Sequence, residues 1–207
     1  MREVEVKYHV QDRDALLVAL KARGIDLSAP VTQDDQAYAP VTWSYGDSKL
    51  GVSFVRLRTV DGNHTFTLKR PAENALSCDE YETGVADREQ MHSAILAMGF
   101  RATVRITKVR RTATLPDLEL CVDEVAGLGT FLELERMVSD GVAGDAVQAE
   151  LAAFVASLDV EAVRTDETYD SLVRAASREA VVDSRGTPGS GLDQDPRSAC
   201  SDVLRLW

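Results

Sequence analysis

Alternation of apolar and charged residues is the clearest pattern in the chain. At the start, Glu3, Glu5 and Lys7 alternate with Val4 and Val6, which predicts a strand with one charged and one apolar face. Similar runs, rich in β-branched and aromatic residues, predict seven further strands. These cover residues 32–39, 53–60, 64–70, 78–85, 103–112, 117–124 and 130–137.

Helical spacing occurs in four segments. Residues 12–23 place Leu16, Leu17 and Leu20 at helical intervals, with Asp12 as the expected N-cap and Gly24 at the end. The other helices are expected over residues 87–98, 143–158 and 169–178. Strands outnumber helices and follow one another through turns, so we predict an α+β fold with helices packed on an antiparallel sheet.

Two segments lack this periodicity. Residues 40–51 contain Trp43 and Tyr45 and predict a loop anchored by these aromatic rings, with stacking on a nucleobase as an alternative role. The segment SRGTPGSGLDQDPRSACSD near the C-terminus is rich in Gly, Pro, Ser and Asp. We therefore predict one folded domain over residues 1–176 and a flexible C-terminal tail over residues 177–207.

Charge recurs at alternate positions on most of the predicted strands, with apolar residues between. A single strand of this kind is typical of an antiparallel sheet with one solvated face. Because so many strands behave alike and few helices are available to cover them, the pattern favours a barrel with its charged face inward. Inward charges must pair with one another or bind an ionic ligand.

These inward charges fall into two sets. The basic set can hold a polyphosphate; it comprises Lys7, Arg56, Arg58, Lys69, Lys108 and Arg110. The acidic set offers the hard oxygen ligands that Mg²⁺ or Mn²⁺ prefers; it comprises Glu3, Glu5, Glu80, Glu82, Asp123, Glu133 and Glu135. Together they indicate metal-assisted phosphoryl chemistry.

Composition narrows the picture further. The chain has 207 residues and a net charge of −11, which argues against binding duplex nucleic acid, since that requires a basic face. No apolar run approaches the length of a transmembrane helix, and the first residues lack a signal-peptide pattern. The three scattered cysteines fit a reducing compartment, so we expect a cytoplasmic protein without a membrane anchor.

The charged motifs occur in an order that resembles the CYTH family of triphosphate tunnel metalloenzymes. The ordered set consists of Glu3-x-Glu5-x-Lys7, Arg56-x-Arg58, Lys69, Glu80-x-Glu82, Lys108-x-Arg110 and the segment from Asp123 to Glu135, DEVAGLGTFLELE. Tyr169-x-x-Leu172 is similar to the C-terminal helix motif of the family. Within the family, the likeness is to the class IV adenylate cyclase branch.

The resemblance implies a fold, a cofactor and residue roles. It implies an eight-stranded antiparallel β-barrel, or tunnel, with flanking helices, a homodimer as the candidate assembly, and two Mg²⁺ or Mn²⁺ ions. It assigns the acidic set to the metals and the basic set to the triphosphate of the substrate. Asp123, Lys108 and Arg110 are expected to act in catalysis.

Three functions remain open at this point. A cyclase would convert ATP to cyclic AMP and pyrophosphate, with the 3′-oxygen attacking the α-phosphorus. A triphosphatase would hydrolyse inorganic triphosphate, thiamine triphosphate or a nucleoside triphosphate. A third interpretation is a nucleotide- or polyphosphate-binding module without turnover. We favour the cyclase because the segment from Asp123 to Glu135 resembles that branch.

Overall fold

The computed structural model describes residues 2–139 and 141–185. Its elements follow one another in the order β1 (Arg2–Val10), α1 (Arg13–Ala22), β2 (Val31–Pro40), β3 (Phe54–Val60), β4 (Asn63–Pro71), β5 (Ser77–Val85), α2 (Arg88–Ala97), β6 (Phe100–Leu115), β7 (Leu118–Val125), β8 (Gly129–Val138), α3 (Gly144–Ser157), β9 (Ala162–Thr165) and α4 (Tyr169–Arg185).

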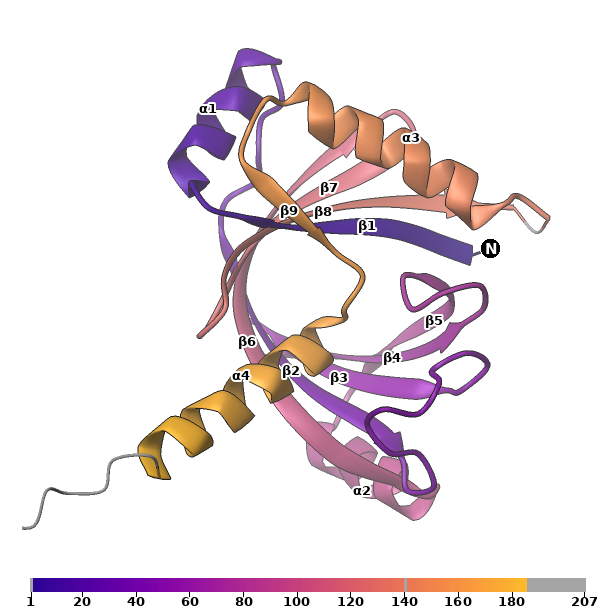
Figure 1. Cartoon of the computed structure of the whole chain (residues 1–207). Coiled ribbons are helices and arrows are strands. Elements are labelled where there is room, and N and C mark those ends of the chain that lie inside the picture. The colour runs from indigo at the N-terminus through magenta and orange to yellow at the C-terminus, as the bar shows by residue number, and fades with distance from the viewer. Residues whose placement is uncertain (1, 140, 186–207) are drawn as a thin grey trace, which may run out of the picture.

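The strands β1 to β8 form a closed antiparallel barrel (Figure 1). Neighbouring strands follow the order β5-β4-β3-β2-β6-β7-β8-β1, and β1 then pairs back with β5. The closing contact is short, because only Arg2–Val4 pairs with Ser77–Asp79. The eight-stranded barrel with flanking helices is thus confirmed.

The strand β9 was not expected from the sequence. It has four residues, Ala162–Thr165, and pairs with Lys7–Val10 of β1. One edge of β1 pairs with β8. The other edge pairs with β5 near its start and with β9 near its end. Such a short segment has too few positions to show a period of two.

The C-terminal helix is longer than predicted. The structure continues α4 to Arg185, beyond the predicted helix end at residue 178, so residues 177–185 of the expected tail are helical here. The remainder of the expected tail, residues 186–207, lies outside the described residues. Elsewhere the predicted helices begin as expected, and the Asp12 side chain accepts a hydrogen bond from the Ala15 amide at 2.9 Å.

Two apolar clusters lie on the outer face of the barrel under the helices, and a third lies on its inner face. The largest cluster packs Val4 and Val6 of β1 against Leu16 of α1 and Leu151 of α3. A second cluster lies under α2, and a third includes the first turns of α4. Helices α1 and α3 cover one end of the barrel wall in Figure 1, and α2 covers the opposite end. The charged residues that alternate with the outer apolar residues consequently face the interior.

Candidate active site

A cavity of about 170 Å³ occupies the interior of the barrel. All six residues of the predicted basic set line it, as do four of the seven acidic residues, Glu3, Glu5, Glu133 and Glu135. Glu80, Glu82 and Asp123 do not contribute to its lining. The antiparallel register explains the gathering, because it places Lys7 opposite Glu133 and Glu5 opposite Glu135.

Asp123 is the centre of a dense ionic cluster. Its carboxylate is fully buried and accepts hydrogen bonds from Lys108 Nζ at 2.7 Å and from Arg110 Nε at 2.7 Å and Nη2 at 2.6 Å. Arg110 also pairs with Glu133 and lies 3.6 Å from Glu135. Burial and the neighbouring Arg110 lower the pKa of Lys108 below its usual range, and Asp123 offsets this only in part.

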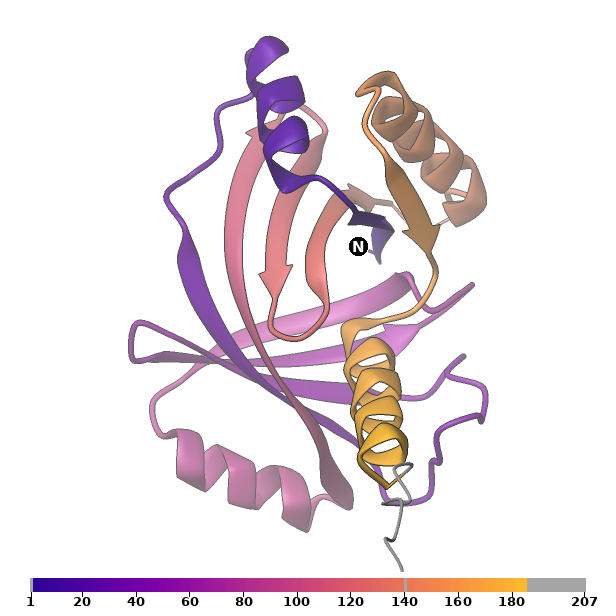
Figure 2. The same cartoon turned by 60° about the vertical axis from the view of Figure 1, so that its left-hand side comes forward.

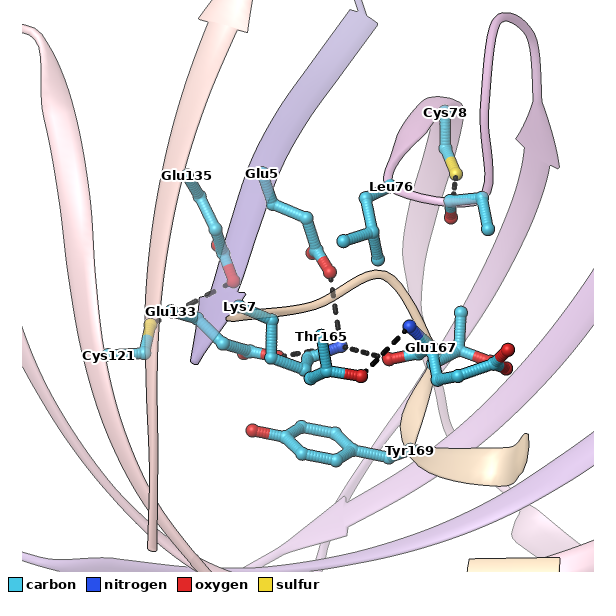
Figure 3. A network of polar contacts seen from close by, with 12 residues as sticks. Glu5, Lys7, Leu76, Cys78, Cys121, Glu133, Glu135, Thr165, Glu167 and Tyr169 are labelled. Carbon is cyan, nitrogen blue, oxygen red and sulfur yellow. Dashed lines mark hydrogen bonds and ion pairs between the residues drawn. The ribbon is translucent and has the colours of Figure 1, made fainter. Parts of the chain in front are cut away.

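Lys7 lies between two carboxylates. Its Nζ is 3.2 Å from Glu5 Oε1 and 3.1 Å from Glu133 Oε1. Burial disfavours the charged ammonium, but Glu5 and Glu133 together outweigh this effect and raise the pKa of Lys7. Lys7 therefore stays protonated inside the barrel. Figure 3 shows its ammonium group between the Glu5 carboxylate and the ring of Tyr169.

A second ionic group connects β1 with β3, β4 and β5. Lys69 Nζ is 2.7 Å from Glu3 Oε1 and 2.7 Å from Glu80 Oε2. Arg56 Nη2 reaches Glu80 at 3.7 Å and Glu82 at 3.4 Å. The Glu82 side chain is 51% exposed, so it lies at the rim of the barrel rather than within it.

Arg58 has a partner that the sequence had not assigned to the site. Its Nε and Nη2 both donate to the Asp35 carboxylate at 2.7 Å, and Asp35 is 4% exposed. This ion pair helps to hold the pKa of Asp35 below its usual range despite burial. Gln33, Asp35 and Ala37 occupy every second position of β2 and therefore share one face of the strand. This shared face was the signal in the sequence that could have placed Asp35 inside the barrel.

The glutamates of β1 and β8 repel one another. Glu5 and Glu135 are directly opposite on adjacent strands, a position in which like charges are unfavourable. Burial and the nearby Glu3 raise the pKa of Glu135 to about 8, although Arg110 opposes the shift. The pKa of Glu5 is also raised, chiefly by burial. Buried carboxylates that disfavour their own ionisation are suited to bind a cation.

The carboxylates are not arranged as a finished metal site. Within residues 2–139 and 141–185, no group of three His, Cys, Asp or Glu side chains has the geometry to hold a metal ion. Most of the acidic set is paired instead with Lys and Arg of the same chain. The donor chemistry of Glu3, Glu5 and Glu135 nevertheless fits a divalent cation, because these hard oxygen donors lie close together and repel one another.

The loop between β2 and β3 and the start of α4 form one end of the cavity lining. Lys49 of this loop lies with Nζ 2.6 Å from Thr168 Oγ1 and 2.9 Å from Ser171 Oγ. Trp43 is 5% exposed and contacts Tyr45 and Phe54 edge to face. The interpretation of Trp43 as a loop anchor is thus confirmed, and its ring is not free to stack on a base.

The cysteines and histidines contribute packing and local contacts. Cys78 and Cys121 are buried free thiols, as expected for packing residues. The histidines contact different groups: His92 lies 2.7 Å from the Tyr38 hydroxyl, His64 3.0 Å from the Thr59 hydroxyl and His9 3.2 Å from the Leu128 carbonyl.

The fold and the interior charges define a β-tunnel protein whose cavity is lined by cations and glutamates. Comparison with known proteins agrees with this description of the fold. The CYTH domain family matches residues 1–169, and the chain belongs to that family. Among the described residues, no helix is both long and apolar enough to cross a membrane.

Similar proteins carry related names. A Methanocaldococcus jannaschii protein named "Putative adenylate cyclase MJ0240" is 30% identical over 77% of this chain and 91% of its own length. The adenylate cyclase CyaB of Aeromonas hydrophila is 28% identical over 67% of this chain and 70% of its own length.

Solved structures share the fold at lower identity. The PH1819 protein of Pyrococcus horikoshii matches with a TM-score of 0.70 at 20% identity, over 84% of this chain and 98% of that one. A Hippeastrum protein, HpAC1, described as a putative adenylyl cyclase with a dominant triphosphatase activity, matches with a TM-score of 0.56 at 17% identity, over 84% of this chain and 95% of that one.

Proposed function

We propose that the protein is a metal-dependent enzyme that acts on a triphosphate inside the barrel, and that its reaction is the conversion of ATP to cyclic AMP and pyrophosphate. The observation that carries the proposal is the cavity itself. It is lined by six basic side chains and by four glutamates, which is the combination needed to hold a polyphosphate together with divalent cations. The names of the Methanocaldococcus and Aeromonas relatives favour the cyclase.

In this proposal, the basic residues bind the triphosphate. Lys7, Arg56, Arg58, Lys69, Lys108 and Arg110 come from four strands and line one cavity, so their charges converge on a single ligand. Arginine guanidinium groups suit the phosphate oxygens because they donate in a bidentate manner. Binding requires that the phosphates replace carboxylates as partners of these cations.

The carboxylates released by the phosphates would hold two Mg²⁺ or Mn²⁺ ions. The proposed ligands are Glu3, Glu5, Glu80, Glu82, Asp123, Glu133 and Glu135. Glu3, Glu133 and Glu5 all repel the Glu135 carboxylate, and all four line the cavity. When bound, the metal supplies neutralisation of the charge on the phosphates.

Asp123, Lys108 and Arg110 are the proposed catalytic residues. Lys108 and Arg110 bring two positive charges against one buried carboxylate, so they can stabilise negative charge that develops on the reacting phosphoryl group. Asp123 can orient the attacking hydroxyl or bind the metal. In the cyclase that hydroxyl is the 3′-hydroxyl of the ATP ribose, and pyrophosphate leaves from the α-phosphorus.

Hydrolysis of a triphosphate is the second candidate. The same residues would serve it, with water attacking the terminal phosphorus of inorganic triphosphate, thiamine triphosphate or a nucleoside triphosphate. The described triphosphatase activity of the Hippeastrum protein of similar fold favours this candidate. A binding module without turnover is the third candidate. A cytoplasmic location and a homodimeric assembly complete the proposal.

The test is analysis of products by mass spectrometry or NMR. The protein is incubated with ATP, other nucleoside triphosphates, thiamine triphosphate or inorganic triphosphate, each with Mg²⁺ or Mn²⁺. Cyclic AMP with pyrophosphate establishes the cyclase, whereas orthophosphate together with the corresponding diphosphate, and no cyclic nucleotide, establishes the triphosphatase. If no substrate gives a product, the protein is a binding module without turnover.

The proposed metal ligands have a matched control. Glu133→Gln should abolish turnover, whereas Glu124→Gln should retain it, because Glu124 pairs with Arg13 on the outer face of the barrel at 3.0 Å and does not line the cavity. Equal activity in the two variants would contradict the assignment of Glu133. Light scattering of the purified protein tests the proposed homodimer.

A further inference from the structure

Tyr169 places an aromatic side chain among the charged residues of the cavity. It is the first residue of α4 and lines the cavity. The edge of its ring meets Phe131 at 5.2 Å between centroids, and Leu172, one turn later, packs in the same apolar cluster. Both residues of the motif Tyr169-x-x-Leu172 therefore pack in the cluster of Ile106 and Phe131 on the inner face of the barrel.

One side chain contacts three proposed site residues. The Tyr169 hydroxyl donates to Asp123 Oδ2 at 3.0 Å. The centre of its ring lies 4.3 Å from Lys7 Nζ and 4.8 Å from Lys108 Nζ. These residues come from β7, β1 and β6 respectively, which lie within the run β6-β7-β8-β1 of the barrel wall, so Tyr169 contacts three strands of that wall. Figure 3 shows the ring next to the Lys7 ammonium group.

The two kinds of contact have different physical effects. An aromatic face attracts an ammonium group without neutralising its charge, so Lys7 and Lys108 are held while remaining able to bind phosphate. The hydroxyl adds a neutral donor to the Asp123 oxygen that already accepts from Lys108 and Arg110. A carboxylate that accepts several hydrogen bonds has little freedom to move.

The first turn of α4, which carries Tyr169, is held by the loop between β2 and β3. Lys49 Nζ lies 2.6 Å from Thr168 Oγ1 and 2.9 Å from Ser171 Oγ, which flank Tyr169 in the chain. On the other side, Lys7 Nζ is 3.4 Å from the Glu167 carbonyl. In Figure 2, β9 and the chain after it lead directly into this first turn of α4. The position of the phenol is thus determined by contacts on both sides.

We propose that Tyr169 is a positioning residue of the site, whose hydroxyl holds Asp123 in place and whose ring orients Lys7 and Lys108 toward a bound triphosphate. The inference rests on the proposed function for the class of ligand. It assigns two roles to one side chain. The hydroxyl affects the reacting groups through Asp123, and the ring affects ligand binding through Lys7 and Lys108.

Two variants separate these roles. Tyr169→Phe removes the hydroxyl and keeps the ring, and Tyr169→Leu removes both. The control is Tyr81→Phe, because Tyr81 lies on β5, is 66% exposed and does not line the cavity. Steady-state kinetics are measured with the substrate that the wild-type protein turns over, and binding of inorganic tripolyphosphate is measured by calorimetry.

We expect Tyr169→Phe to lower kcat about tenfold with KM and the tripolyphosphate Kd within about twofold of wild type. We expect Tyr169→Leu to raise the Kd about threefold to tenfold as well. The inference is overturned if Tyr169→Phe matches Tyr81→Phe in kcat, or if Tyr169→Leu binds tripolyphosphate as tightly as wild type. If Tyr169→Leu does not fold, Tyr169→Phe decides the role of the hydroxyl, and an unchanged kcat in that variant still overturns the inference.

The outcome also distinguishes this inference from the proposed function. A wild-type protein that binds tripolyphosphate but turns over no substrate contradicts the enzymatic proposal, and the calorimetric comparison still decides the role of the ring. A wild-type protein that does not bind tripolyphosphate contradicts both. Turnover in the wild type with unchanged kinetics in both Tyr169 variants contradicts the inference alone.

Discussion

Glu135 makes a specific prediction about how stability depends on pH. Its pKa in the folded protein is about 8, compared with the ordinary value of 4.5. Between these values the folded protein binds a proton that the unfolded chain releases, so the free energy of unfolding must fall as pH rises. At about 1.36 kcal/mol per pH unit, the full difference corresponds to roughly 5 kcal/mol. Movement of Glu3 and Glu5 away from Glu135 reduces this, and we expect about 2 to 5 kcal/mol.

The assay is urea denaturation of the wild type and of Glu135→Gln, in EDTA, at intervals from pH 5 to 8.5. The difference in unfolding free energy between the two proteins isolates Glu135, because other groups titrate in both. We expect Glu135→Gln to gain stability relative to wild type as pH rises, and Mg²⁺ to stabilise the wild type more at pH 8 than at pH 5.5. Parallel curves for the two proteins, with and without Mg²⁺, would show that Glu135 does not take up a proton on folding.

Three further predictions concern stability and metal dependence. Asp123→Asn leaves Lys108 and Arg110 without their buried counter-charge and should lower the unfolding free energy by about 3 to 5 kcal/mol in urea denaturation, whereas a change below about 0.5 kcal/mol would show that the cluster rearranges. Leu151→Ala opens a cavity in the fully buried contact between α3 and β1 and should cost about 2 to 5 kcal/mol by the same assay; a loss below 1 kcal/mol would mean that the helix collapses into the space. Removal of divalent cations with EDTA should abolish turnover and restoration of Mg²⁺ or Mn²⁺ should recover it, so persistent turnover in EDTA would contradict a metal-dependent reaction.

Several features of the site followed from the sequence because they depend on local parity. In a strand, successive side chains point to opposite faces. The alternation of Glu3, Glu5 and Lys7 with Val4 and Val6 was therefore sufficient to separate interior from exterior. The same rule placed Arg56, Arg58 and the other cations inside, and all six line the cavity.

Features that depend on contacts between distant segments did not follow. Closure of the barrel rests on three residue pairs between β1 and β5, and β9 is too short to show a pattern. The pairing between interior cations and carboxylates was also open. The sequence shows which basic and acidic residues face inward, but it does not show how the strands that carry them are aligned. Asp35, which pairs with Arg58, was visible as a residue but had no partner until β2 was aligned with β3.

Tyr169 shows the division between sequence and tertiary structure most directly. The sequence alone determined an eight-stranded fold with a charged interior and cations and carboxylates in a fixed order, because strand periodicity is a property of neighbouring residues. Folding in three dimensions was needed to bring the phenol of Tyr169, from α4, against Asp123, Lys7 and Lys108. That arrangement depends on how α4 packs across the barrel and on the register of β1, β6 and β7, and long-range packing of this kind has no local signature.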